Sequence, residues 1–174
     1  MKICLLGLVV FLVPAVRAAD PLVVALRDSY QTMRLYLLKS AEMMPEPEYR
    51  FKLTPVSRTF GDWVRHTAEM NYTACANLRG IRVPGAPELK AAATKAELTA
   101  VLNASFEFCD PAFRGMTSQK LMTEITSGDR RLFPVVEMVG LTNSLHEHYG
   151  NLIGYLRSKE ITPPSTLRTQ RVLQ

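Results

Sequence analysis

Apolar residues recur along most of the chain with the period of an amphipathic helix. Between residues 21 and 42 they lie three or four positions apart, as in Leu26, Tyr30 and Met33, which places them on one face of a helix. Three prolines in the stretch 45–55 then interrupt the pattern. The spacing therefore predicts a first helix over residues 21–42.

The same pattern continues in the middle of the chain. A second helix is predicted from Thr54–Pro55, since proline after a capping residue is typical of a helix start, to Gly80, a typical end. A third helix is predicted from Thr94, which has capping-box spacing to Glu97, until Pro111 kinks or ends it.

The C-terminal part adds one short helix and one long helix. We expect the short one at residues 118–126 and the long one from about Leu132 to Lys159, where a Thr-Pro-Pro stretch stops it. No segment alternates apolar and polar residues for long enough to predict a sheet. Four long amphipathic helices predict an all-α fold, a four-helix bundle.

The connection between the second and third helices indicates the topology. The 14 residues from Gly80 to Ala93 form a long link, which at about 3.3 Å per residue can run the length of a helix. Cys75 and Cys109 would differ in axial level by about 8 Å if the two helices are parallel, and by roughly 15 Å if they are antiparallel. We therefore expect parallel second and third helices and a disulfide between Cys75 and Cys109.

The N-terminus has the pattern of an export signal. Lys2 precedes an apolar run over residues 3–16, and small residues end at Ala18, so we expect a signal peptide over residues 1–18. The alternative is an uncleaved membrane anchor, for which the run is short. We expect a domain over residues 19–165, a flexible tail over residues 166–174, and a periplasmic or secreted protein.

Charge and hydropathy exclude two classes of protein. Loss of Lys2 and Arg17 with the signal would reduce the formal charge from +5 to +3, which is 19 basic minus 16 acidic residues. This surplus is too small to favour nucleic-acid binding. No second apolar run of spanning length follows, so the processed chain is not expected to be an integral membrane protein.

The histidines are the candidate metal ligands. His146 and His148 project about 200° apart on a helix, so they cannot hold one metal together. A helical metal pair needs a spacing of three or four, and Ser144 stands four before His148. Spacing alone therefore favours ordinary, partly buried histidines, including His66, over a metal site.

Two stretches, YRFKLTPVSRTFGDWVRHTAEMNYTACANLRG and HEHYGNLIGYLRSKEITPPS, resemble the bacterial DinB-like (DinB/YfiT) superfamily. The resemblance implies a four-helix bundle with parallel second and third helices. It also implies a divalent metal, zinc or nickel, held by three histidines, of which one matches His66 and another His148, while the third falls on Ser144. The metal site is thus expected to be degenerate unless Glu69, Glu147 or a water completes it.

Two functions remain open on this basis. The resemblance implies metal-dependent transferases or hydrolases that activate a thiol cofactor or a water. The departure at Ser144 instead favours an exported bundle with a weak or lost metal site, which binds a small molecule or a protein. Whether the chain is an enzyme, and whether it forms a homodimer, is left undecided by the sequence.

Overall fold

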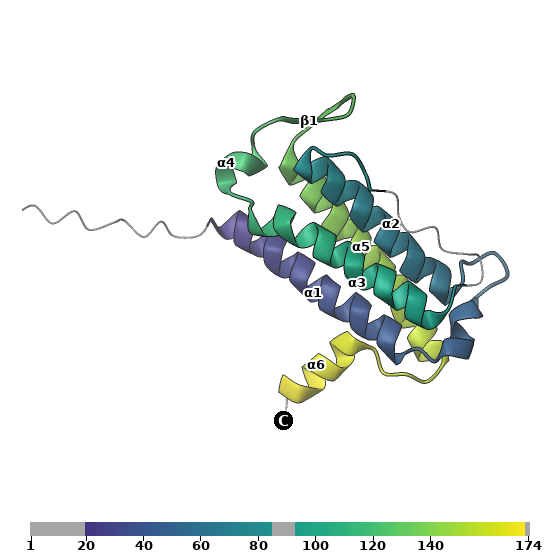
Figure 1. Ribbon diagram of the computed structural model, residues 1–174. Coiled ribbons are helices and arrows are strands. Elements are labelled where there is room, and N and C mark those ends of the chain that lie inside the picture. Colours follow the sequence, from purple (N-terminus) through teal and green to yellow (C-terminus); the bar gives the residue numbers. More distant parts are fainter. Residues whose placement is uncertain (1–19, 85–92, 173–174) are drawn as a thin grey trace, which may run out of the picture.

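Four long helices packed side by side form the body of the protein (Figure 1). The computed structural model describes residues 20–84 and 93–172. The long helices are α1 (Pro21–Met43), α2 (Phe60–Arg79), α3 (Lys95–Arg114) and α5 (Pro134–Ser158). The shorter elements are η1 (Glu46–Arg50), α4 (Ser118–Leu121), β1 (Ile125–Ser127), β2 (Arg130–Leu132) and α6 (Pro164–Val172). The prediction of an all-α bundle is confirmed.

Capping residues determine where α2 and α3 begin. Thr94 and Glu97 form the predicted capping box at the start of α3. The start predicted for the second helix at Thr54–Pro55 is wrong, because Thr59 and Asp62 form a complete capping box five residues later. Pro111 lies in the last turn of α3, which continues to Arg114, so it does not end the helix.

A small β-hairpin replaces the second half of the predicted short helix. α4 ends at Leu121, and β1 pairs antiparallel with β2, with Ser127 opposite Arg130. The two-residue loop between these partners contains Gly128 at φ 59°, the left-handed conformation that tight hairpin turns require. The expectation of no sheet is wrong here, because strands of three residues are too short for their alternation to be recognised.

The C-terminal segment is also more regular than the sequence indicates. The flexible tail predicted from residue 166 begins inside α6, although its flexibility stays a prediction. Tyr149 holds the first turn of α6, since its hydroxyl donates to Ser165 Oγ at 2.8 Å and accepts from Ser165 N at 2.9 Å. The predicted signal, residues 1–18, lies outside the described residues, and the division into signal and domain stays a prediction.

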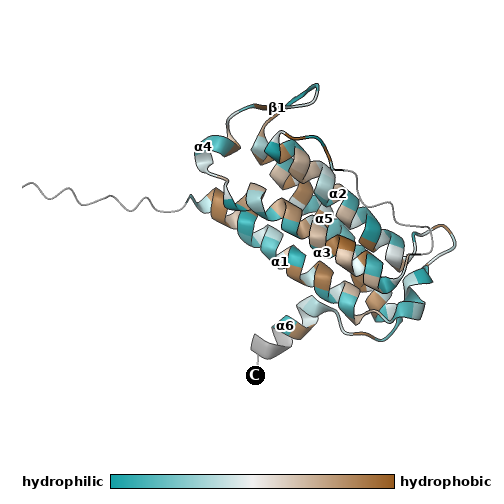
Figure 2. Ribbon diagram, viewed as in Figure 1, coloured by the Kyte–Doolittle hydropathy of each residue, from teal (hydrophilic) through white to brown (hydrophobic). Residues whose placement is uncertain are grey.

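The core lies between the four long helices. Apolar and polar residues both occur along each helix, as Figure 2 shows. The apolar residues form the face that packs against the other helices. The largest fully buried side chains include Tyr30, Phe60, Phe106, Leu145 and Tyr155. None of the helices in residues 20–84 and 93–172 combines the length and apolarity needed to cross a bilayer.

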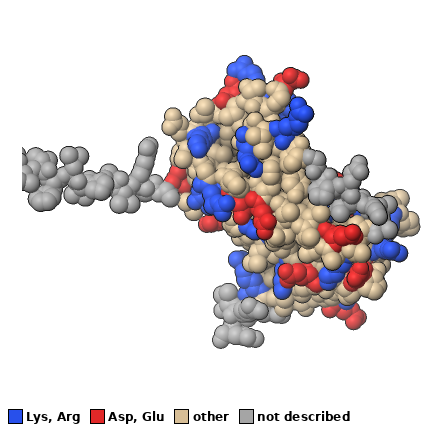
Figure 3. All heavy atoms as spheres, viewed as in Figure 1, with Lys and Arg blue, Asp and Glu red and all other residues tan. Residues whose placement is uncertain are grey.

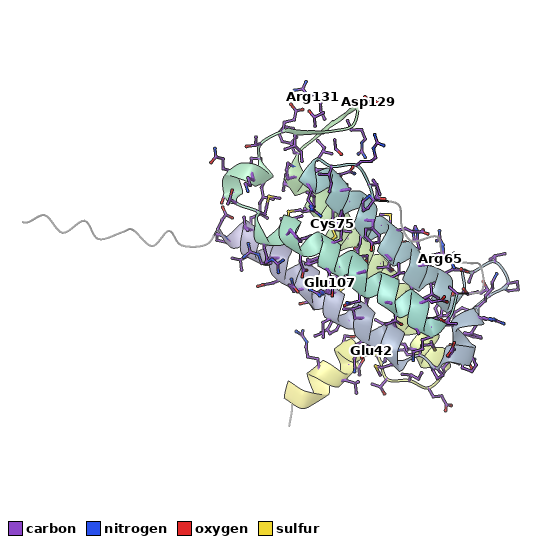
Figure 4. The ribbon with its side chains drawn as sticks, in the orientation of Figure 1. Glu42, Arg65, Cys75, Glu107, Asp129 and Arg131 are labelled. Atoms are coloured by element: carbon purple, nitrogen blue, oxygen red, sulfur yellow. A yellow bond between two sulfur atoms is a disulfide. The ribbon has the colours of Figure 1, made fainter. Side chains whose placement is uncertain are left out.

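Helices α2 and α3 run in the same direction. The contacts between them occur in the same order along both helices. Gly61 lies beside Leu98 near the start of each helix, and Cys75 is bonded to Cys109 nearer the end of each. The two cysteines have a Cα–Cα distance of 5.2 Å and join α2 to α3, and Cys75 is labelled in Figure 4. The predicted disulfide is therefore confirmed.

Candidate functional site

The two histidines proposed as metal ligands lie next to each other between α2 and α5. The ring centroids of His66 and His148 are 5.0 Å apart. Trp63, one turn before His66 on α2, has its ring 5.4 Å from His148 and 6.1 Å from His66. Residues separated by 82 positions in the sequence thus form one aromatic cluster, which we call the two-histidine site.

Hydrogen bonds fix the ring of His148 in one tautomer. The hydroxyl of Thr67 donates to the carbonyl oxygen of Trp63 at 2.8 Å, which uses its only proton. Thr67 Oγ1 therefore accepts from His148 Nδ1, 3.2 Å away, so this nitrogen carries the proton. The other ring nitrogen, Nε2, is left with its lone pair for a ligand or a metal.

The surroundings of His148 keep it uncharged at neutral pH. The residue is only 3% exposed. Burial lowers the pKa of His148 to about 4, and electrostatic interaction with His66 and Arg58 acts in the same direction. The guanidinium of Arg58 lies 4.9 Å above the Trp63 ring, so a cation borders the site on this side.

The lowered pKa of His148 predicts a loss of stability in acid. The unfolded chain binds a proton on this histidine near pH 6.5 and the folded chain only near pH 4, so stability falls as the pH drops below 6.5. We expect His148 to reduce the free energy of unfolding by about 2 kcal/mol between about pH 7.5 and about pH 5. Urea unfolding at the two pH values measures this change in the free energy of unfolding.

Two variants separate this effect from other titrating groups. His148→Gln removes the titration, so its unfolding free energy should fall less over the same pH interval. His146→Ala is the matched control, which shows how far the loss of a different histidine changes the same pH dependence. An identical pH dependence in His148→Gln and the parent would show that His148 is not held neutral by its surroundings.

The other candidate ligands do not join the pair. His146 is exposed, and its Nδ1 donates to the carbonyl oxygen of Thr142 at 2.7 Å. Its ring is therefore hydrogen-bonded to the backbone of its own helix. Ser144 is half-buried, one turn before His148. Glu69 has a carboxylate oxygen 3.9 Å from His66 Nδ1 but is half exposed, and Glu147 is exposed.

The donor set differs from the three-histidine centre that the resemblance implies. Within residues 20–84 and 93–172, no group of three His, Cys, Asp or Glu side chains is placed to hold a metal ion. A stable zinc site needs at least three protein ligands. His66 and His148 supply two nitrogens, which do not fit such a centre without a further ligand at Ser144 or from outside the chain.

The sequence did not identify every member of the site. Trp63 is only partly buried and contacts both histidines. Its spacing of three from His66 and four from Thr67 indicates a shared helix face. Arg58 lies inside the helix predicted from Thr54, but in the structure it precedes the cap of α2, so the sequence did not indicate its position over the Trp63 ring.

Comparisons with known proteins identify the fold. No protein-family model matches the sequence, and no curated protein matches it either. The structure is similar to a DinB-like protein from Bacillus subtilis, with a TM-score of 0.63 and 18% identity over 79% of this chain and 93% of that one. A DinB-like protein from Bacillus cereus gives a TM-score of 0.65 and 13% identity, covering 80% and 93% of the two chains.

A third similar structure is a conserved protein from Enterococcus faecalis. Its TM-score is 0.61 at 14% identity, and the match covers 80% of this chain and 97% of that one. The matches span nearly the whole length of all three proteins, so the similarity extends to the complete bundle and not to a helical pair alone. This chain therefore has the DinB-like four-helix-bundle fold.

Proposed function

We propose that this protein is an exported DinB-like bundle whose two-histidine site binds a small organic ligand and holds metal weakly. The observation that supports this proposal is the pairing of His66 and His148 beside Trp63, with serine where a third ligand is expected. Two imidazoles and a hydroxyl are a poor metal centre. They are suitable hydrogen-bonding groups for an organic molecule.

The chemistry of the site restricts the ligand. Nε2 of His148 accepts a hydrogen bond, because Nδ1 carries the proton. The guanidinium of Arg58 lies over the partly exposed ring of Trp63, so a flat apolar group would pack against the rest of the indole, next to this cation. We therefore propose a flat ligand with a hydrogen-bond donor at its edge, either free or as a side chain of a protein partner.

Fluorescence of Trp63 provides a direct test, because it is the one tryptophan in the sequence. Titration with simple phenols should quench its emission, and the methyl ethers of the same phenols should bind several-fold more weakly because they cannot donate to His148. His148→Phe should remove the difference between phenols and ethers. Equal binding of phenols and ethers by the parent would contradict the proposed role of His148.

Export is supported by two features. The apolar run over residues 3–16 has the length and flanks of a signal peptide. The disulfide between Cys75 and Cys109 is a bond that forms in oxidising compartments. A mature protein that begins at Ala19 when isolated from the periplasm or the medium is the expected result.

The second candidate is a divalent-metal-dependent transferase or hydrolase. One observation favours it: the hydrogen bond from His148 Nδ1 to Thr67 leaves Nε2 free, which is the usual arrangement of a metal-binding histidine. This function requires stoichiometric zinc or nickel in the parent protein, with a water or substrate group in place of the third histidine.

A further inference from the structure

One end of the bundle exposes apolar side chains to solvent. The end is formed by the start of α1, the end of α2, α4, the β1–β2 hairpin and the start of α5 (Figure 1). Val136 is 66% exposed and Met122 is 65% exposed. The large exposed apolar residues of this end are Leu22, Ile81, Met122, Phe133, Val136 and Val139. We call this surface the apolar end.

Hydrogen bonds hold these segments together. Ser118 Oγ donates to Asp20 at 2.5 Å, which joins α4 to the start of α1. Asn77 donates from Nδ2 to Glu137 Oε1 at 2.9 Å, and its Oδ1 accepts from Ser127 Oγ at 3.0 Å. The end of α2 is thereby joined to both the hairpin and α5. The segments that carry the exposed apolar residues are consequently joined to one another at this end of the bundle.

Basic side chains surround this surface. Arg79, Arg82, Lys120 and Arg130 are exposed, and among the described residues none of the four forms an ion pair with a carboxylate. Arg131 at the hairpin pairs with Glu124, and Asp129 lies near it (Figure 4). Figure 3 shows blue Lys and Arg atoms around the hairpin end on the face that is drawn, with red Asp and Glu atoms among them.

Apolar side chains with a basic border fit one kind of partner. Surface contacts of this composition bind anionic lipid, because the apolar groups enter the interface while arginine and lysine pair with phosphates. We propose that the apolar end docks on an anionic phospholipid surface.

Vesicle sedimentation tests this proposal. The full chain is expressed and used in the form in which the expressing cells process it, and mass spectrometry determines the N-terminus of that form. The test variant is Met122→Ser/Val136→Ser, and the control variant is Leu35→Ser/Val56→Ser, which removes two exposed apolar side chains elsewhere. All three proteins share the same N-terminus, so differences between them report on the apolar end. Thermal unfolding by circular dichroism should give the same midpoint for all three.

The parent and the control should bind vesicles of phosphatidylglycerol and phosphatidylcholine equally. The test variant should bind about tenfold more weakly. Arg82→Gln/Arg130→Gln should weaken binding to these vesicles without changing binding to pure phosphatidylcholine. Equal binding by all variants would overturn the proposal. A parent dimer that becomes monomeric in the test variant would also overturn it, because a second copy would then cover the surface.

Discussion

Ser144→His is expected to convert the two-histidine site into a tight metal site. A histidine here would lie one turn before His148 on the same helix face, and with His66 it would bring three imidazoles together. Ser144 is half-buried, so the larger side chain has room to turn toward the pair. We expect zinc and nickel to bind about a hundredfold more tightly than to the parent, or about 2.7 kcal/mol.

Isothermal titration calorimetry with zinc gives this comparison directly. His146→Ala is the matched control, because His146 is bonded to Thr142 on its own helix and should contribute nothing. Its zinc affinity should equal that of the parent. If the parent binds zinc tightly and His146→Ala abolishes binding, the chain has built its metal site from other residues than His66 and His148.

Removal of the disulfide is expected to have the second largest effect, which is a loss of stability. It joins two residues separated by 34 positions, both of them fully buried between α2 and α3. In the chain-entropy model, closing a loop of this size stabilises the folded state by about 3 to 4 kcal/mol. Cys75→Ala/Cys109→Ala should therefore lower the free energy of unfolding in urea by about this amount.

Reduction of the parent provides the control for this variant. The parent measured in reducing agent should unfold at a urea concentration close to that of the double variant measured in either state. Thiol titration of the denatured, unreduced mature protein should find no free thiol. Two free thiols per chain would show that the bond does not form in the cell.

The helices of this protein were predictable because their signals are local. Periodicity located α1 and α5, and the capping box at Thr94 located the start of α3. The start of α2 was misplaced because two capping residues, Thr54 and Thr59, lie five positions apart, and only the second is followed three positions later by a carboxylate, that of Asp62. The hairpin was missed because strands of three residues carry too little pattern.

The candidate site was predictable only in part. The resemblance gave His66 and His148, which the structure places in contact. The hydrogen bond between Thr67 and His148 could not be read from the sequence, because it depends on how α2 and α5 face each other. The same holds for the charge state of His148, since burial lowers its pKa and burial follows from packing.

The metal content of the purified protein tests the central claim most directly, which is that the two-histidine site does not hold a metal tightly. The protein should be produced with zinc and nickel in the medium and purified without chelator. Elemental analysis after dialysis is expected to find far less than one equivalent of either metal in the parent, and close to one in Ser144→His. One full equivalent retained by the parent, and lost in His148→Ala, would contradict this account and favour the metal-dependent enzyme.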